Sequence, residues 1–172
     1  MIKMIQIIKV TFKLSKETEK QTLRYFLDKP VKEGQDDSFA LLVRDYPELL
    51  KLRELKQEEQ DKQINSFVED KYKELKDQLK IDLSLAKKNW NTVKKQFLKE
   101  AQKLFDNAEL PKEEYTAYLT IFARYRYDRD KKFFCVPRNN YRNNINCVTI
   151  HELLHFTFFK FWKENFEGKL NE

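Results

Sequence analysis

Residues 148–162 read VTIHELLHFTFFKFW, and this stretch decides how the rest of the chain must be arranged. It contains no glycine or proline, and apolar side chains fall on nearly every side of a helix drawn through it. A helix that is apolar nearly all round is buried against the rest of its domain. We therefore predict a buried helix from about Asn146 to Phe166, with Gly168 just after it as the residue that terminates the helix.

Three polar residues inside this stretch, His151, Glu152 and His155, have the spacing HExxH, and the chain contains no other histidine. Residues four apart lie on one side of a helix, so both imidazoles can bind one ion, with Glu152 displaced toward a metal-bound water. Imidazole suits zinc, and a carboxylate within reach can take a proton from the zinc-activated water. The alternative interpretation is two histidines that are hydrogen-bonded within a core.

The stretch VTIHELLHFT resembles the extended HExxH signature of the zincin metallopeptidases, most closely their gluzincin branch. The resemblance implies a zinc-dependent hydrolase of peptide bonds, with His151 and His155 as ligands of Zn2+, Glu152 as the catalytic general base, and a peptide or protein as substrate. It further implies an α+β, helix-rich zincin-like domain with a long backing helix, a small antiparallel sheet or hairpin, and a buried HExxH active-site helix. In that fold the edge strand of the hairpin lies above the active-site helix and aligns the substrate by strand addition.

The third zinc ligand of gluzincins is a glutamate on a following helix, commonly about twenty residues or more after the second histidine. Glu164 and Glu167 lie roughly 13 to 18 Å along the helix axis from His155, too far to share its metal. Glu172, after the helix, can fold back over a short span. We therefore expect the third ligand to be Glu172 or a residue beyond the chain end, and residues 1–172 to form a single zincin-like domain truncated at its C-terminus.

Other reactive side chains lie near the motif. Cys147 precedes His151 by one turn but is about 12 Å from His155 in a straight helix, so we predict a buried apolar role for it rather than zinc binding. Cys135 receives the same interpretation. The candidate donors to a developing oxyanion are three tyrosines, Tyr125, Tyr127 and Tyr141.

The first part of the chain predicts a strand followed by short helices. Residues from Ile2 to Phe12 are β-branched and aromatic, which is typical of a strand. Ser15 is the expected N-cap of a helix that ends before Pro30, and Ser38 is the expected cap of a short helix through Val43. Pro47 fits the first turn of a further helix.

A long stretch without glycine or proline, from Glu48 to about Asn107, has apolar residues at helical spacing. It predicts one long backing helix, or two with a break near Ile81 to Ser84; a coiled-coil arm is the alternative. After it, the β-rich runs Tyr115 to Tyr127 and Lys132 to Pro137 predict a hairpin with a longer loop, which the resemblance makes the substrate-aligning sheet.

Composition sets the remaining expectations. The net charge is +6, but 34 basic residues are interspersed with 28 acidic ones, so we do not expect a nucleic-acid partner. There is no signal peptide and no run of 18 apolar residues, and two cysteines form no disulfide framework; these features predict a cytoplasmic protein without a membrane partner.

Two alternatives to a peptidase remain at this point. One is a catalytically degenerate zincin-like domain that acts as a helical interaction or scaffold protein, in which the long helix mediates self-association. The other is a basic protease associated with DNA or RNA, whose binding would fall steeply with salt. The sequence leaves the oligomeric state open.

Overall fold

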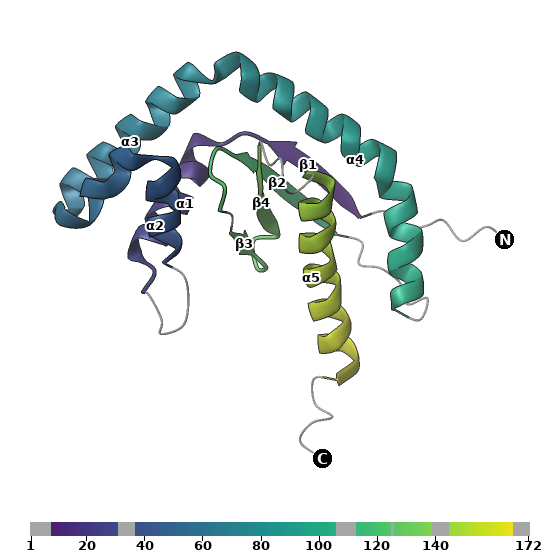
Figure 1. Ribbon diagram of the computed structural model, residues 1–172. Helices are drawn as coiled ribbons and strands as arrows, with labels where there is room; N and C mark the ends of the chain where they lie inside the picture. Colours follow the sequence, from purple (N-terminus) through teal and green to yellow (C-terminus); the bar gives the residue numbers. More distant parts are fainter. Residues whose placement is uncertain (1–7, 31–36, 106–112, 125, 139–144, 167–172) are drawn as a thin grey trace.

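The computed structural model describes residues 8–30, 37–105, 113–124, 126–138 and 145–166 (Figure 1). Its elements are, in chain order, β1 (Lys9–Lys13), α1 (Lys16–Asp28), α2 (Ser38–Asp45), the 3-10 helix η1 (Pro47–Glu54), α3 (Gln57–Glu74), α4 (Lys76–Leu104), β2 (Glu114–Thr120), β3 (Tyr127–Asp128), β4 (Phe133–Pro137) and α5 (Ile145–Phe166). The chain is therefore helix-rich with one small sheet, which confirms the α+β class. None of the helices in these ranges is long and apolar enough to cross a lipid bilayer.

The four strands form one sheet in the order β1-β2-β4-β3. β1 pairs with β2 and β2 pairs with β4 in parallel, and only the edge strand β3 is antiparallel to its neighbour β4. The prediction of a purely antiparallel hairpin from Tyr115 to Pro137 was therefore wrong for the first run. That run is divided into β2 and β3, and only β3 and β4 form a hairpin.

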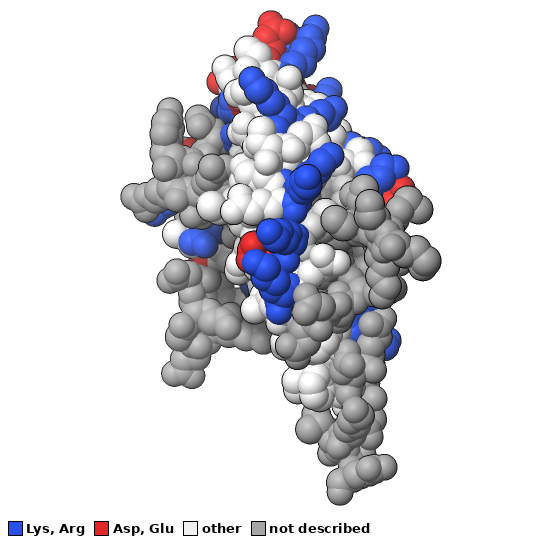
Figure 2. Space-filling view, turned by 90° about the vertical axis from the view of Figure 1, so that its right-hand side faces the viewer, with Lys and Arg blue, Asp and Glu red and all other residues white. Residues whose placement is uncertain are grey.

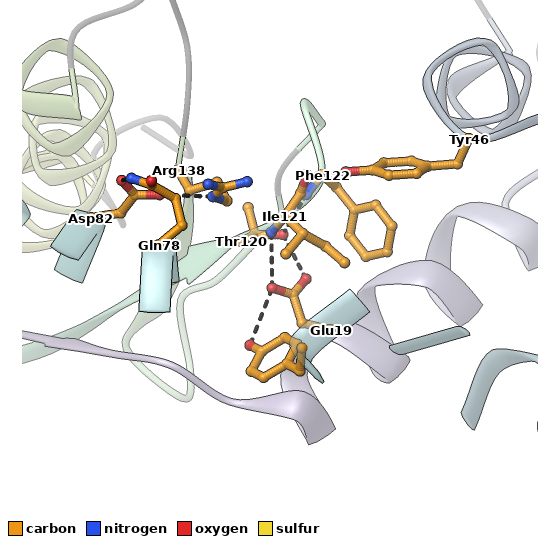
Figure 3. Close-up of polar contacts among 9 residues, drawn as sticks. Glu19, Tyr46, Gln78, Asp82, Thr120, Ile121, Phe122 and Arg138 are labelled. Carbon is orange, nitrogen blue, oxygen red and sulfur yellow. Dashed lines mark hydrogen bonds and ion pairs between the residues drawn. The ribbon is translucent and has the colours of Figure 1, made fainter. Parts of the chain in front are cut away.

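The stretch Tyr115 to Tyr127 is divided at Ile121, where side chains form hydrogen bonds with the backbone N–H and C=O that a longer strand would use for pairing (Figure 3). The N–H of Ile121 donates to the Glu19 carboxylate at 3.0 Å, and its carbonyl accepts from the Tyr46 hydroxyl at 2.7 Å. Thr120 donates to the same carboxylate at 2.7 Å. Because the backbone groups of Ile121 are hydrogen-bonded to side chains of α1 and of the residue that follows α2, they do not pair with another strand, and β2 ends at Thr120.

Several helix boundaries agree with the sequence. The Ser15 hydroxyl accepts from the N–H of Thr18, which confirms the predicted N-cap of α1. Pro47 occupies the first turn of a helix as predicted, although that helix is of the 3-10 type. The cap of α2 is Asp37, not Ser38, because its carboxylate accepts from two backbone N–H groups of the first turn.

The stretch predicted as one or two helices from Glu48 to about Asn107 begins with the 3-10 helix η1 and continues, after Lys56, as α3 and α4. The break between α3 and α4 lies at Leu75 rather than between Ile81 and Ser84, and Asn107 lies outside the described residues. Leu75 has φ −97° and ψ 10°, which ends α3 and starts α4. In Figure 1 the two helices form an arch over one side of the sheet. The predicted strand from Ile2 to Phe12 is β1, Lys9–Lys13, and its residues before Ile8 lie outside the described ranges.

The arch has two apolar clusters beneath it. One lies among α4, the sheet and α5 and includes Phe12, Trp90, Phe134 and Leu153. The other gathers α1, α2, η1 and α3 with the residues that follow β2, and includes Leu23, Phe39, Leu52, Ile64 and Phe122. Because the apolar side of α4 is packed in this way, the backing-helix interpretation fits better than a free coiled-coil arm.

One polar link fixes α4 to the end of β4. Arg138 donates to the carboxylate of Asp82 at 2.7 Å, and Gln78 donates to the other oxygen of that carboxylate at 2.7 Å (Figure 3). Both charged side chains are largely buried. A buried charge that loses its partner keeps its desolvation cost, which makes this pair sensitive to substitution.

We expect Arg138→Gln to lower the free energy of unfolding by about 2 kcal/mol, because Asp82 would lose its charged partner. Urea denaturation at neutral pH measures the change. The matched control is Lys80→Gln, which removes the exposed ion pair between Lys80 and Asp77 on the same helix and should cost less than about 0.5 kcal/mol. Equal effects of the two substitutions would contradict this account of the Asp82 pair.

Candidate metal centre

The helix that carries the HExxH motif, α5, is buried on one side only. Val148, Leu153 and Phe156 point into the core, whereas Phe158 and Trp162 are more than two fifths exposed. The expectation of an active-site helix buried all round was therefore wrong, because α4 and the sheet together cover only part of its circumference. The helix begins at Ile145, close to the predicted start.

His151 and His155 converge on one point beside this helix. Their Nε2 atoms are 2.9 Å apart, so one imidazole donates a hydrogen bond to the other. The side chain of His151 is 60% exposed, which leaves the pair open to solvent. The pKa of His155 lies below its usual value because burial, and secondarily the neighbouring His151, disfavour the charged ring. The neutral imidazole is the form that binds metal.

Glu152 lies on the inner side of the same turn and is only 2% exposed. One carboxylate oxygen, Oε1, is 3.9 Å from Nε2 of His151, and the other, Oε2, is buried without a hydrogen-bond partner among the described residues. Burial raises the pKa of this carboxyl to about 7. A buried carboxyl without a partner is costly, and such groups are frequent at functional sites.

Aromatic rings surround the histidine pair on the side of the sheet. Tyr127, in the edge strand β3, stacks on the ring of His155 with centroids 6.1 Å apart and planes 7° apart. Phe159 lies near the same imidazole at 6.3 Å, and the guanidinium of Arg129 covers Phe159 at 4.2 Å. Of the three candidate tyrosines, Tyr127 is the one the structure brings to the site; Tyr125 and Tyr141 lie outside the described residues.

A groove of about 680 Å³ opens next to the pair between the end of α4 and α5. Its lining consists of both histidines and apolar side chains, namely Leu104, Phe105, Leu154, Phe158, Phe159 and Phe161. None of the sequence predictions placed Phe159, Arg129 or the end of α4 at the site. Phe159 had a signal, because it follows His155 by four residues and so lies on the same side of the helix.

No cluster of three or more His, Cys, Asp or Glu side chains in the described ranges could hold a metal, so the expected third ligand is not found among these residues. Glu167 and Glu172 lie outside these ranges, as does the side chain of Glu164. Cys147 is exposed, so its predicted burial was wrong; α5 presents that position to solvent. Cys135 is buried in β4, as predicted.

The two histidines fit a zinc ion in distance and in chemistry. Two imidazole nitrogens bound to one tetrahedral zinc lie about 3.3 Å apart, given Zn–N distances of about 2.0 to 2.1 Å. The observed 2.9 Å between the Nε2 atoms differs from this by a small ring movement. The unpartnered Oε2 of Glu152 adds a buried acceptor next to the pair.

The fold and the site thus define an α+β protein with a His-Glu-His arrangement on a half-buried helix. Comparison with known proteins adds no relative to this description: no family model, no curated protein and no solved structure matches the chain. What the protein does must therefore be argued from the site itself.

Proposed function

We propose that this chain is a zincin-like zinc metallopeptidase domain that hydrolyses peptide bonds. His151 and His155 hold the zinc ion, and Glu152 is the general base. The observation that carries the proposal is the convergence of the two Nε2 atoms, 2.9 Å apart, beside a buried carboxylate that has an unpartnered oxygen.

Each residue has a distinct part in the proposed reaction. Zinc, when bound, supplies Lewis-acid polarisation of a carbonyl and lowers the pKa of water. Glu152 accepts the proton of the attacking water. Its side chain is buried and lies 3.9 Å from His151 Nε2, which keeps it close to the proposed metal ligand. Tyr127 holds the ring of His155 in place by stacking, and because this residue is 46% exposed we assign its hydroxyl as the donor to an oxyanion.

The placement of β3 supports a peptide as the substrate. β3 is the last strand in the order of the sheet, and its only pairing among the described residues is with β4. Through Tyr127 this strand lies directly beside His155. An extended peptide that adds to this edge would pass next to the histidine pair, and the apolar groove on the other side would receive its side chains.

Zinc binding tests the proposal most directly. We expect the purified chain to bind zinc more tightly than the His155→Ala variant by about a hundredfold or more, because one imidazole alone is a weak ligand. Isothermal titration with Zn2+ in a chelating competitor buffer measures both affinities. Cys147→Ser is the matched control, since Cys147 is exposed one turn before His151, and its affinity should equal that of the wild type.

Zinc affinity that is unchanged in His155→Ala would contradict the proposed metal site. Loss of affinity in Cys147→Ser as well would point to a different ligand set. A chain that folds and self-associates without any zinc affinity would favour the helical scaffold protein instead.

A further inference from the structure

One helix, α4, carries a net positive charge nearly as large as that of the whole chain. α4 contains eight lysines and three carboxylates, a net charge of +5, whereas the whole chain carries +6. Between Leu83 and Lys99 the helix has five lysines and no acidic residue. We call these five the lysine face: Lys87, Lys88, Lys94, Lys95 and Lys99. They span about 18 Å of helix axis.

The lysine face points outward and is not neutralised within the described part of the chain. Lys87, Lys88, Lys95 and Lys99 are exposed, and none of them has an ion pair with a described carboxylate. Lys94 donates to Asn91 on its own helix at 2.9 Å. Figure 2, which looks onto the side where α4 lies, shows basic side chains running along this surface with few acidic ones among them.

The neighbouring helix α3 has the opposite charge, and half of its six carboxylates are already in ion pairs, among them that of Glu74 with Lys71. α3 contains six acidic residues and three lysines. Glu69 pairs with Lys16 and Lys20 of α1, and Asp61 pairs with Arg24 of the same helix. Glu58, Glu59 and Asp70 are exposed and have no ion pair among the described residues. Pairing of α3 with the lysine face of a second copy is therefore the competing interaction that the sedimentation measurement below tests.

A regularly charged polymer matches this surface better than a membrane does. A helix that binds a bilayer inserts its apolar side, and the apolar side of α4, including Ala86, Trp90 and Phe97, is buried in the core. A duplex carries about one negative charge per 1.7 Å of its axis, so ammonium groups spread along about 18 Å of one helix can meet several phosphates at once. Lysine binds phosphate as a point charge and needs no fixed geometry.

We propose that the lysine face of α4 binds the phosphate backbone of double-stranded nucleic acid without reading its sequence. The surface contains no arginine and no aromatic side chain that could read or stack on bases. The binding would hold the protein on the polymer whether or not the histidine pair hydrolyses peptides.

The test uses the full chain and a fluorescein-labelled DNA duplex of about 20 base pairs, titrated by fluorescence anisotropy from about 50 to 200 mM salt. The test variant carries Lys87→Gln, Lys88→Gln, Lys95→Gln and Lys99→Gln. The matched control carries Lys51→Gln, Lys56→Gln, Lys62→Gln and Lys73→Gln, four exposed lysines on and next to η1 and α3. Both variants have the same net charge, and circular dichroism checks that both keep their helices.

We expect the test variant to bind about tenfold more weakly or worse at low salt, and its log–log salt slope to be reduced by about 3 to 4. The control variant should stay within about threefold of the wild type, and a duplex of scrambled sequence should bind equally well. Absence of DNA binding by the wild type would overturn the proposal, as would equal weakening in the two variants. Stronger binding to phosphatidylserine vesicles than to DNA, or lysine-dependent self-association by sedimentation, would overturn it in favour of those partners.

Discussion

The Glu152→Gln variant is expected to hydrolyse peptides about a hundredfold to ten-thousandfold more slowly than the wild type while it still binds zinc. Glutamine has nearly the shape of glutamate, but its amide cannot accept the proton of the attacking water. The imidazoles of His151 and His155, the proposed zinc ligands, are unchanged. Turnover of a quenched fluorescent peptide library, measured with the zinc content of both proteins, gives the two readouts.

The loss of activity should not come from unfolding. Burial raises the pKa of Glu152 to about 7, so at pH 8 the folded protein carries an unfavourable buried charge that glutamine removes. The melting temperature of the variant at pH 8 should therefore equal or exceed that of the wild type. Glu58→Gln, an exposed change in α3, is the control and should keep full activity. Hydrolysis by Glu152→Gln at the wild-type rate would contradict the role of Glu152 as the general base.

The second large effect concerns Glu19, whose carboxylate is 2% exposed and accepts from Thr120, Ile121 and Tyr72. Burial raises its pKa from 4.5 to about 7. Between these two values the unfolded chain releases a proton that the folded protein keeps. The contribution of Glu19 to the free energy of unfolding is therefore largest below about pH 4.5, and it falls by about 3 kcal/mol as the pH rises through 7.

We expect Glu19→Gln to remove this part of the pH dependence, because glutamine can still accept from Ile121 and donate to Thr120. Urea unfolding at about pH 5 and about pH 8 compares the variant with the wild type. Glu152 is present in both proteins, so its own titration cancels in the difference. Glu17→Gln, an exposed change on the same helix, should follow the wild type. Parallel pH profiles of Glu19→Gln and the wild type would contradict the assignment to Glu19.

Features of the fold that depend on neighbouring residues were predicted well. The Ser15 cap, the position of Pro47 and the start of α5 follow from local hydrogen bonding and helix propensity. The break between α3 and α4 was predicted near Ile81 to Ser84 but lies at Leu75, where no residue type disfavours a helix. α3 packs on one apolar cluster and most of α4 on the other, and a change of direction between them is set by tertiary packing.

Features that depend on distant residues could not be predicted. The run Tyr115 to Tyr127 has strand composition throughout, yet it ends at Thr120 because Glu19 and Tyr46 bind the backbone of Ile121. In the site, the motif predicted that His151 and His155 would converge, since helical spacing alone places them together. It did not predict the stacking of Tyr127, which depends on how β3 returns to the helix.

Two neighbouring strands of the sheet, β1 and β2, pair across a long sequence separation, which affects how the chain folds. Lys9 of β1 pairs with Glu114 of β2, 105 residues later, and Glu19 binds Ile121 across 102 residues. During synthesis the first strand therefore leaves the ribosome long before its partner exists. Contacts of such sequence separation slow folding, and β1 must wait with unpaired backbone groups while the helices of the arch form first.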